Sequence, residues 1–135
     1  PRKNLDYVHR LLRKGGIFAM VFPNWESVDR RLFGKAWIGY DAPRHLFIYP
    51  ASVIQEVMEA SGFKIIYFKS GPNNYYSFVT SLHSWLRLKF SNRKLANLIA
   101  GIFNFPGVRF IFQPVISILD LLGKSGTSCL IAVKK

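Results

Sequence analysis

Acidic residues are scarce in this chain of 135 residues, which has 7 Asp and Glu against 19 Lys and Arg and a formal net charge of +12. Such an excess of positive charge ordinarily indicates an anionic partner, namely nucleic acid, phospholipid or a phosphorylated substrate. The chain starts at Pro1 and enters a helical pattern without a signal-peptide layout. We therefore expect a piece of a longer protein, whose total charge can differ from the charge of this piece.

Cysteine and histidine are also rare. The lone Cys129 excludes an internal disulfide framework and cannot form a zinc site by itself, which fits a reducing compartment such as the cytoplasm. His9, His45 and His83 lie far apart in the sequence and lack the spacing of metal ligands. The chain contains no G-x-G-x-x-G, P-loop, H-E-x-x-H or G-x-S-x-G motif. These absences disfavour a hydrolase or a metal site.

The first half of the chain alternates helical and strand patterns. Apolar residues at helical spacing predict a helix over about 4–14, ended by Gly15-Gly16. The run "IFAMVF", 17–22, has no polar alternation, which is typical of a strand buried on both faces. A short helix is expected over 27–33. A second helix is predicted from the capping-box spacing of Ser52 and Gln55 to Gly62, and a second strand follows at 63–69.

The second half is a long aromatic stretch with helical periodicity, followed by a third strand at 127–134. We expect Pro106 and Pro114 to divide the stretch into separate helices. The chain is thus predicted to be a single α/β domain over 1–135, with a helical insertion at 72–122 between its second and third strands. A parallel sheet is the arrangement that alternating helices and strands favour.

The insertion allows two interpretations. Its uncharged run from Leu95 to Val108 has 14 residues, fewer than the ~20 that a membrane-spanning helix needs. Its aromatic residues nevertheless lie beside Arg87, Lys89, Arg93 and Lys94, as in helices that bind anionic membrane surfaces. The alternative is that the apolar stripes pack on the sheet or on one another. Nucleic-acid binding is disfavoured because the aromatic residues follow helical stripes and no RNA-binding signature is present.

Two places are candidates for a site. The first is Pro23-Asn24 with Trp25 and Glu26, because ligands of open parallel sheets gather at the carboxyl ends of the strands. The second is "WIGYDAPRHLFIYP", 37–50, in which prolines restrain a loop that carries Asp41, Arg44 and His45. His45 is a candidate general base, with Asp41 orienting it or Arg44 holding an anionic group. The structural alternative is an Asp–Arg pair that fixes the loop, with His45 bonded to the backbone.

The segments "LLRKGGIFAMVFPN", "DRRLFGKAWIGYDAPRHLFIYPASVIQEVMEASGF" and "GTSCLIAVKK" resemble the C-terminal half of class I S-adenosylmethionine-dependent methyltransferases. The similarity is greatest to the group of ubiquinone-biosynthesis-like and small bacterial methyltransferases. It covers about 5–70 and 123–135, and W-x-G-x-D-x-P-R-H-L is its more specific motif. It implies a Rossmann-like sheet whose last strand is antiparallel and lies between the other two.

The resemblance also implies roles and omissions. Asn24 would face the methyl acceptor, and Trp37, Asp41, Arg44 and His45 would form an acceptor loop with His45 as the base. The glycine-rich turn and the acidic residue that hold S-adenosylmethionine in the family are not in this chain, so we do not expect the chain to bind the cofactor tightly. The leading hypothesis is the substrate side of a methyltransferase for a small-molecule, glycan or lipid-linked acceptor, inactive alone. The alternative is a basic module peripheral to anionic membranes.

Overall fold

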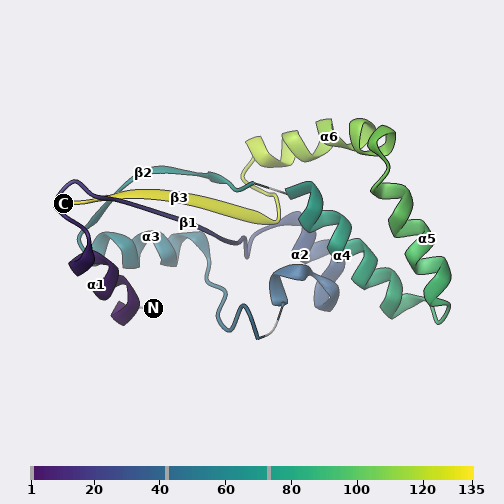
Figure 1. Ribbon diagram of the computed structural model, residues 1–135, viewed down its shortest axis with the longest axis horizontal. Helices are drawn as coiled ribbons and strands as arrows, with labels where there is room; N and C mark the ends of the chain where they lie inside the picture. The colour runs from purple at the N-terminus through teal and green to yellow at the C-terminus, as the bar shows by residue number, and fades with distance from the viewer. Residues whose placement is uncertain (1, 42, 73) are drawn as a thin grey trace.

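The computed structural model describes residues 2–41, 43–72 and 74–135 and shows three strands, six α-helices and two short 3₁₀ helices in that part of the chain (Figure 1). In chain order the elements are α1 (Arg2–Leu11), β1 (Ile17–Pro23), α2 (Val28–Phe33), η1 (Gly34–Ala36), η2 (Ile38–Tyr40), α3 (Ala51–Ala60), β2 (Phe63–Ser70), α4 (Asn74–Lys89), α5 (Arg93–Phe103), α6 (Pro106–Leu121) and β3 (Thr127–Lys134).

The three strands form one sheet in the order β1-β3-β2. The central strand β3 runs antiparallel to both neighbours, so that Cys129, for example, pairs with Val21 on one side and Lys69 on the other. This confirms the order and direction implied by the family resemblance. The expectation of parallel pairing, drawn from the alternation of helices and strands alone, was wrong, because β1 and β2 share a direction but β3 separates them.

One face of the sheet carries the core. Met58 from α3, Phe63 from β2 and Leu130 and Ala132 from β3 are all fully buried there, against apolar side chains of α1 and β1. In Figure 1, α1 and α3 lie together along this face of the sheet.

The prediction that 17–22 is buried on both faces was wrong. Phe18, Met20 and Phe22 pack against the core, whereas Ile17 and Val21 on the opposite face are 64% and 52% exposed. A continuous apolar run looks the same in the sequence whether helices cover one face of the strand or both faces.

The turn between α1 and β1 has the predicted glycine. Gly15 has φ of 76° and donates its amide hydrogen to the carbonyl oxygen of Lys134 at 3.0 Å. The ammonium group of Lys134 in turn donates to the carbonyl oxygens of His9 and Leu12, at 2.6 and 2.9 Å. A cation at this position satisfies carbonyl groups that the helix end leaves free. The helix is therefore joined to the central strand as well as stopped by glycine.

Two local predictions did not hold. The helix α3 begins at Ala51 with Pro50 as its N-cap, and no side chain caps it, so Ser52 lies two positions beyond the N-cap that the predicted capping box requires. Pro114 lies inside α6 instead of ending a helix. Proline removes one helical hydrogen bond, and the opposite side of α6 is held by Ile116, which is buried with Tyr75 and Val79 of α4.

Pro106, by contrast, starts α6 as its first residue, so the predicted break between helices at this proline is confirmed. The side chain of Asn92 starts α5 by accepting hydrogen bonds from the amides of Lys94 and Leu95. The helices α4, α5 and α6 extend from the end of the sheet that lies away from α1 (Figure 1). Leu86 of α4 packs on Ala96 and Ala100 of α5, and these small residues let the two helices approach closely.

Candidate functional site

The residues after β1 tie the end of this strand to the start of β3. The side-chain amide of Asn24 donates to the carbonyl oxygens of Gly123 and Ser125, both at 3.0 Å, and its oxygen accepts from the amide of Glu26 at 3.0 Å. Asn24 is 4% exposed. Both of its side-chain donor hydrogens are therefore engaged in joining two segments about a hundred residues apart in the sequence.

Trp25 and Glu26 lie on the outside of this junction. The guanidinium group of Arg30 stacks over the ring of Trp25 at 4.1 Å. The carboxylate of Glu26 lies 3.7 Å from the ammonium group of Lys124. Both contacts again connect the end of β1 with neighbouring surface residues.

Trp37 anchors the loop that follows. It is 1% exposed and packs with Phe33 and Ala36, against Phe78 and Trp85 of α4. Its indole Nε1 has no hydrogen-bond partner among the described residues. Burial of an aromatic ring of this size is a large apolar contribution to stability. Trp37, the first residue of the W-x-G-x-D-x-P-R-H-L motif, therefore anchors the start of the loop in the core between α2 and α4.

The motif then forms a short, internally bonded loop. Asp41 and Arg44 form an ion pair, with 3.2 Å between Oδ2 and Nη1, and the amide of His45 donates to the carbonyl oxygen of Asp41 at 3.1 Å. The Nδ1 atom of His45 lies 3.1 Å from the carbonyl oxygen of Gly39. A carbonyl oxygen only accepts, so Nδ1 carries the proton and the Nε2 atom of the neutral ring keeps its lone pair. The loop therefore has the Asp41–Arg44 pair and the backbone contact of His45 that a purely structural role predicts. It also holds His45 in the tautomer that a general base needs.

Asp41, Arg44 and His45 line one pocket of about 400 Å³. The rest of its wall comes from the ends of β1 and β3, the segment before α4 and the first turn of that helix. These further lining residues are Val21, Pro23, Ile38, Gly39, Pro72, Tyr76, Ser77, Gly126 and Thr127. The fold thus brings the loop of the motif to the carboxyl end of β1, as ligand sites of open sheets are placed. Asn24 and Trp37 are not part of the lining.

A buried carboxylic acid behind this pocket was not predicted from the sequence. Asp29 of α2 is 2% exposed, and its Oδ2 atom has no hydrogen-bond partner among the described residues. The pKa of Asp29 is raised from 3.8 to about 6, chiefly by burial and to a smaller extent by the negative charge of Asp120, while hydrogen bonding to its own backbone and to Ser77 acts in the opposite direction. Asp29 and Ser77 also confine Gly126, whose added Cβ would lie 2.6 Å from Oδ2 of Asp29.

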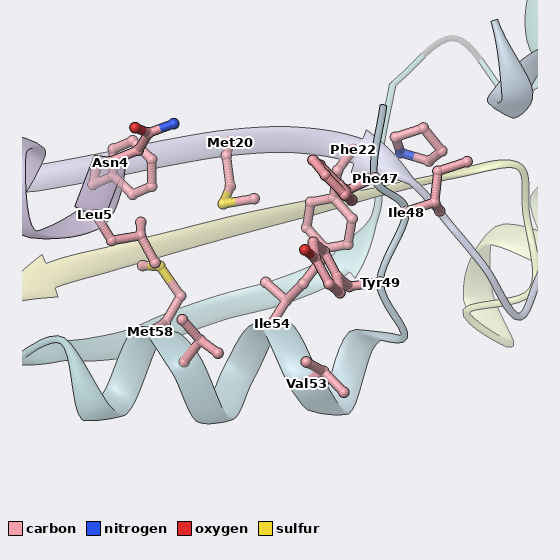
Figure 2. A pocket seen from close by; sticks show the side chains of 13 residues that line it. Asn4, Leu5, Met20, Phe22, Phe47, Ile48, Tyr49, Val53, Ile54 and Met58 are labelled. Atoms are coloured by element: carbon pink, nitrogen blue, oxygen red, sulfur yellow. The ribbon is translucent and has the colours of Figure 1, made fainter. Parts of the chain in front are cut away.

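A second pocket, of about 300 Å³, lies on the other side of the same loop and is almost wholly apolar. Figure 2 shows Met20 and Phe22 of β1 facing Ile54 and Met58 of α3 across it. Phe47, Ile48 and Tyr49 close the end nearest the loop, and Pro23 borders both pockets. The segment 44–49 therefore lies between a pocket that carries charged and polar side chains on a partly apolar wall and a pocket that is almost wholly apolar.

In 2–41, 43–72 and 74–135 no group of three or more His, Cys, Asp or Glu side chains is arranged to hold a metal ion. The segment that follows β1, Asn24-Trp25-Glu26, contains no glycine, and the side chain of Asn24 is bonded to backbone groups.

Comparisons with known proteins give a distant structural similarity. No family model matches the sequence, and no curated protein matches it. The fold is similar to part of a solved structure of Haemonchus contortus phospholethanolamine N-methyltransferase 2 in complex with phosphomonomethylethanolamine and S-adenosylhomocysteine. That similarity covers 98% of this chain and 30% of the other, with 16% sequence identity and a TM-score of 0.42. The chain thus spans less than a third of the length of the methyltransferase that it partly resembles.

Proposed function

We propose that this chain is the acceptor-side part of an S-adenosylmethionine-dependent methyltransferase that acts on a small-molecule, glycan or lipid-linked hydroxyl group. The observation that carries the proposal is the hydrogen bond from His45 Nδ1 to the carbonyl oxygen of Gly39, at 3.1 Å, in a loop that lines a pocket with Arg44 and Asp41. The sequence resemblance and the antiparallel β3 between β1 and β2 support the same assignment.

In this proposal His45 is the general base that removes the proton of the acceptor's hydroxyl group. The hydroxyl proton moves to the lone pair on Nε2, and the resulting imidazolium keeps its Nδ1–H bond to Gly39. The hydroxyl oxygen retains the electron pair of the broken O–H bond and becomes the nucleophile. S-adenosylmethionine, bound by residues outside this chain, would supply the electrophilic methyl group, and the electron pair of its S–CH3 bond would leave with S-adenosylhomocysteine.

Arg44 and Asp41 position the acceptor. Arg44 is 77% exposed and, among the described residues, pairs with Asp41 through one of its terminal nitrogens, so the rest of its guanidinium group can bind an anionic group. A phosphate or carboxylate on the acceptor is the group that such a fork binds best. Asn24 acts indirectly, by fixing the end of β1, and Trp37 by anchoring the start of the loop.

The test uses two forms of the protein. The present chain should show no measurable heat of binding with S-adenosylmethionine, and a form extended upstream of Pro1 by its gene should bind the cofactor. In the extended form, transfer of a labelled methyl group into cell extracts should fall by about 10²-fold or more in His45→Ala, as for loss of a general base. Failure of the extended form to bind S-adenosylmethionine would overturn the proposal.

A further inference from the structure

The outer side of α6 is a long apolar surface without charge. Phe110 and Leu121, near its two ends, are 82% and 88% exposed. Helical spacing places them on the side opposite the buried Ile116. We call this surface the outer arc of α6, and it consists of the exposed residues Phe110, Ile111, Pro114, Val115, Ser117, Ile118, Leu121 and Leu122.

The surface continues onto α5. Leu95, Leu98 and Ile102 recur at helical spacing and are 40%, 66% and 51% exposed. Phe105, in the connection to α6, is 65% exposed. Leu98, Ile102, Phe105 and Val108 surround one shallow hollow, which shows that the apolar sides of the two helices meet where the chain bends by 72°. The apolar surface is therefore shared by both helices and by the connection between them.

Positive charge borders this surface. Residues 74–122 contain five Lys and Arg and a single acid, Asp120. The Asp120 carboxylate accepts a hydrogen bond from the buried Asn74, on the inner side of α6. Arg87, Lys89, Arg93 and Lys94 are exposed and gather around the turn from α4 to α5. The exposed charge of this part of the chain is thus almost wholly positive.

We propose that α5 and the outer arc of α6 bind the surface of an anionic lipid bilayer. Apolar side chains enter the boundary between headgroups and acyl chains, while neighbouring cations contact anionic headgroups. No single described helix is long and apolar enough to cross a membrane. Among the described helices, α5 and α6 reach that length and apolar composition only when they are taken together, and the chain bends by 72° between them. The proposal is therefore attachment at the interface.

Charge favours lipid over a second copy of this chain as the occupant. A symmetric contact between two copies uses the same surface on both. It would join two surfaces that carry the same exposed cations, and neither copy would offer an exposed acid to offset them, because the single acid of residues 74–122, Asp120, is turned inward on each copy. An anionic bilayer offers the opposite charge. The inference does not depend on methyl transfer.

The experiment is co-sedimentation of the chain with vesicles. Phosphatidylcholine vesicles containing about one third phosphatidylglycerol should bind it, pure phosphatidylcholine vesicles should bind it at least about tenfold more weakly, and salt should weaken the binding to the anionic vesicles. The double variant Phe110→Ser, Leu121→Ser changes two side chains that are almost fully exposed, so the fold should persist while binding falls by about tenfold or more.

Charge is tested with two matched sets. Arg87→Gln, Lys89→Gln, Arg93→Gln and Lys94→Gln together should abolish the preference for anionic vesicles. The control set Lys3→Gln, Arg10→Gln, Arg13→Gln and Lys14→Gln removes the same charge from exposed positions at the other end of the molecule, on and after α1 (Figure 1). It should lower binding by less than about threefold. Equal losses from the two sets, or failure of the unmodified chain to bind anionic vesicles, would overturn the proposal.

The oligomeric state distinguishes binding of a second copy of this chain from binding of lipid. Light scattering should show a monomer for both the unmodified chain and the Phe110→Ser, Leu121→Ser variant. A dimer that the double variant converts to a monomer would mean that the outer arc binds another copy, and would also overturn the proposal.

Discussion

The amide of Ile38 donates a hydrogen bond to Oγ of Ser81, at 3.0 Å. Ser81 belongs to α4 and is fully buried, and Ile38 is the first residue of η2, whose Gly39 carbonyl oxygen accepts from His45. The helical insertion therefore supports the loop that carries the proposed base. A change inside α4 can alter the orientation of His45 without touching the pocket.

Replacing Ser81 by alanine tests this support. The change leaves the Ile38 amide without its partner, so the free energy of unfolding should fall by about 1–3 kcal/mol. In the unmodified chain, ¹⁵N spectra of the neutral His45 ring should show the proton on Nδ1, and in Ser81→Ala the two tautomers should become more evenly populated. Ser117→Ala, at an exposed position of α6, should change neither quantity. An unchanged tautomer ratio in Ser81→Ala would show that α4 does not control the orientation of the His45 ring.

Gly39 should not tolerate a side chain. A Cβ atom at this position would overlap the ring of Trp37, which is 1% exposed and has little space to move. We expect Gly39→Ala to lower the free energy of unfolding by about 1–3 kcal/mol, measured by urea denaturation. Gly101 of α5 is the control, because no atom lies within 4 Å of an added Cβ there. Gly101→Ala should raise stability by about 0.5–1 kcal/mol, since alanine is the better helix former.

Asp29 should make stability fall as pH rises. Its pKa is about 6 in the folded chain, against 3.8 for the ordinary carboxyl group, so between these values the folded state binds more protons than the unfolded state. The stabilisation is complete below about pH 4 and is lost as pH rises through about 6, a change on the order of 3 kcal/mol. Asp29→Asn should remove this loss and be the more stable form at pH 7.

Urea denaturation at about pH 4 and pH 7 measures the difference. Asp6→Asn, at an exposed position of α1, provides the control and should keep the slope of the unmodified chain. Identical slopes in Asp29→Asn and the unmodified chain would show that Asp29 ionises normally when buried.

Asn24 should matter for stability even where methyl transfer is not measured. Asn24→Ala leaves the carbonyl oxygens of Gly123 and Ser125 without their side-chain donor. The contact with Ser125 is the buried one of the two, and an unpaired buried acceptor costs about 1–3 kcal/mol, so we expect a loss of about 1–3 kcal/mol in urea denaturation. Asn97→Ala removes an exposed contact with His83 and should cost less than about 0.5 kcal/mol. A loss in Asn24→Ala no larger than in this control would mean that the junction is held by the backbone alone.

Local patterns predicted the elements of this fold well. Glycines marked the ends of α1 and α3 because the turn after each helix needs a positive φ, which Gly15 and Gly62 adopt at 76° and 83°. The periodicity of the insertion located three helices. The family resemblance supplied what local patterns do not contain, namely the central position and direction of β3.

Features that depend on distant parts of the chain were missed. The burial of one face of β1 depends on which helices cover the sheet, and the continuity of α6 through Pro114 depends on contacts with α4. Asp29 gave no signal because an acid in a short helix is ordinarily solvated; its burial arises from Ser77 and Gly126, far away in the sequence. The predicted Asp41–Arg44 pair and the backbone contact of His45 lie within one loop, where sequence spacing is a good guide to distance.

The position of β3 determines when this protein can fold during synthesis. Both edge strands leave the ribosome well before β3, yet each pairs only with β3 in the described sheet. Until residues 127–134 emerge, β1 and β2 lack the strand with which they pair and expose backbone groups and apolar side chains to solvent. We expect the nascent chain to bind chaperones over this interval, and translation arrest before residue 127 to leave it sensitive to protease.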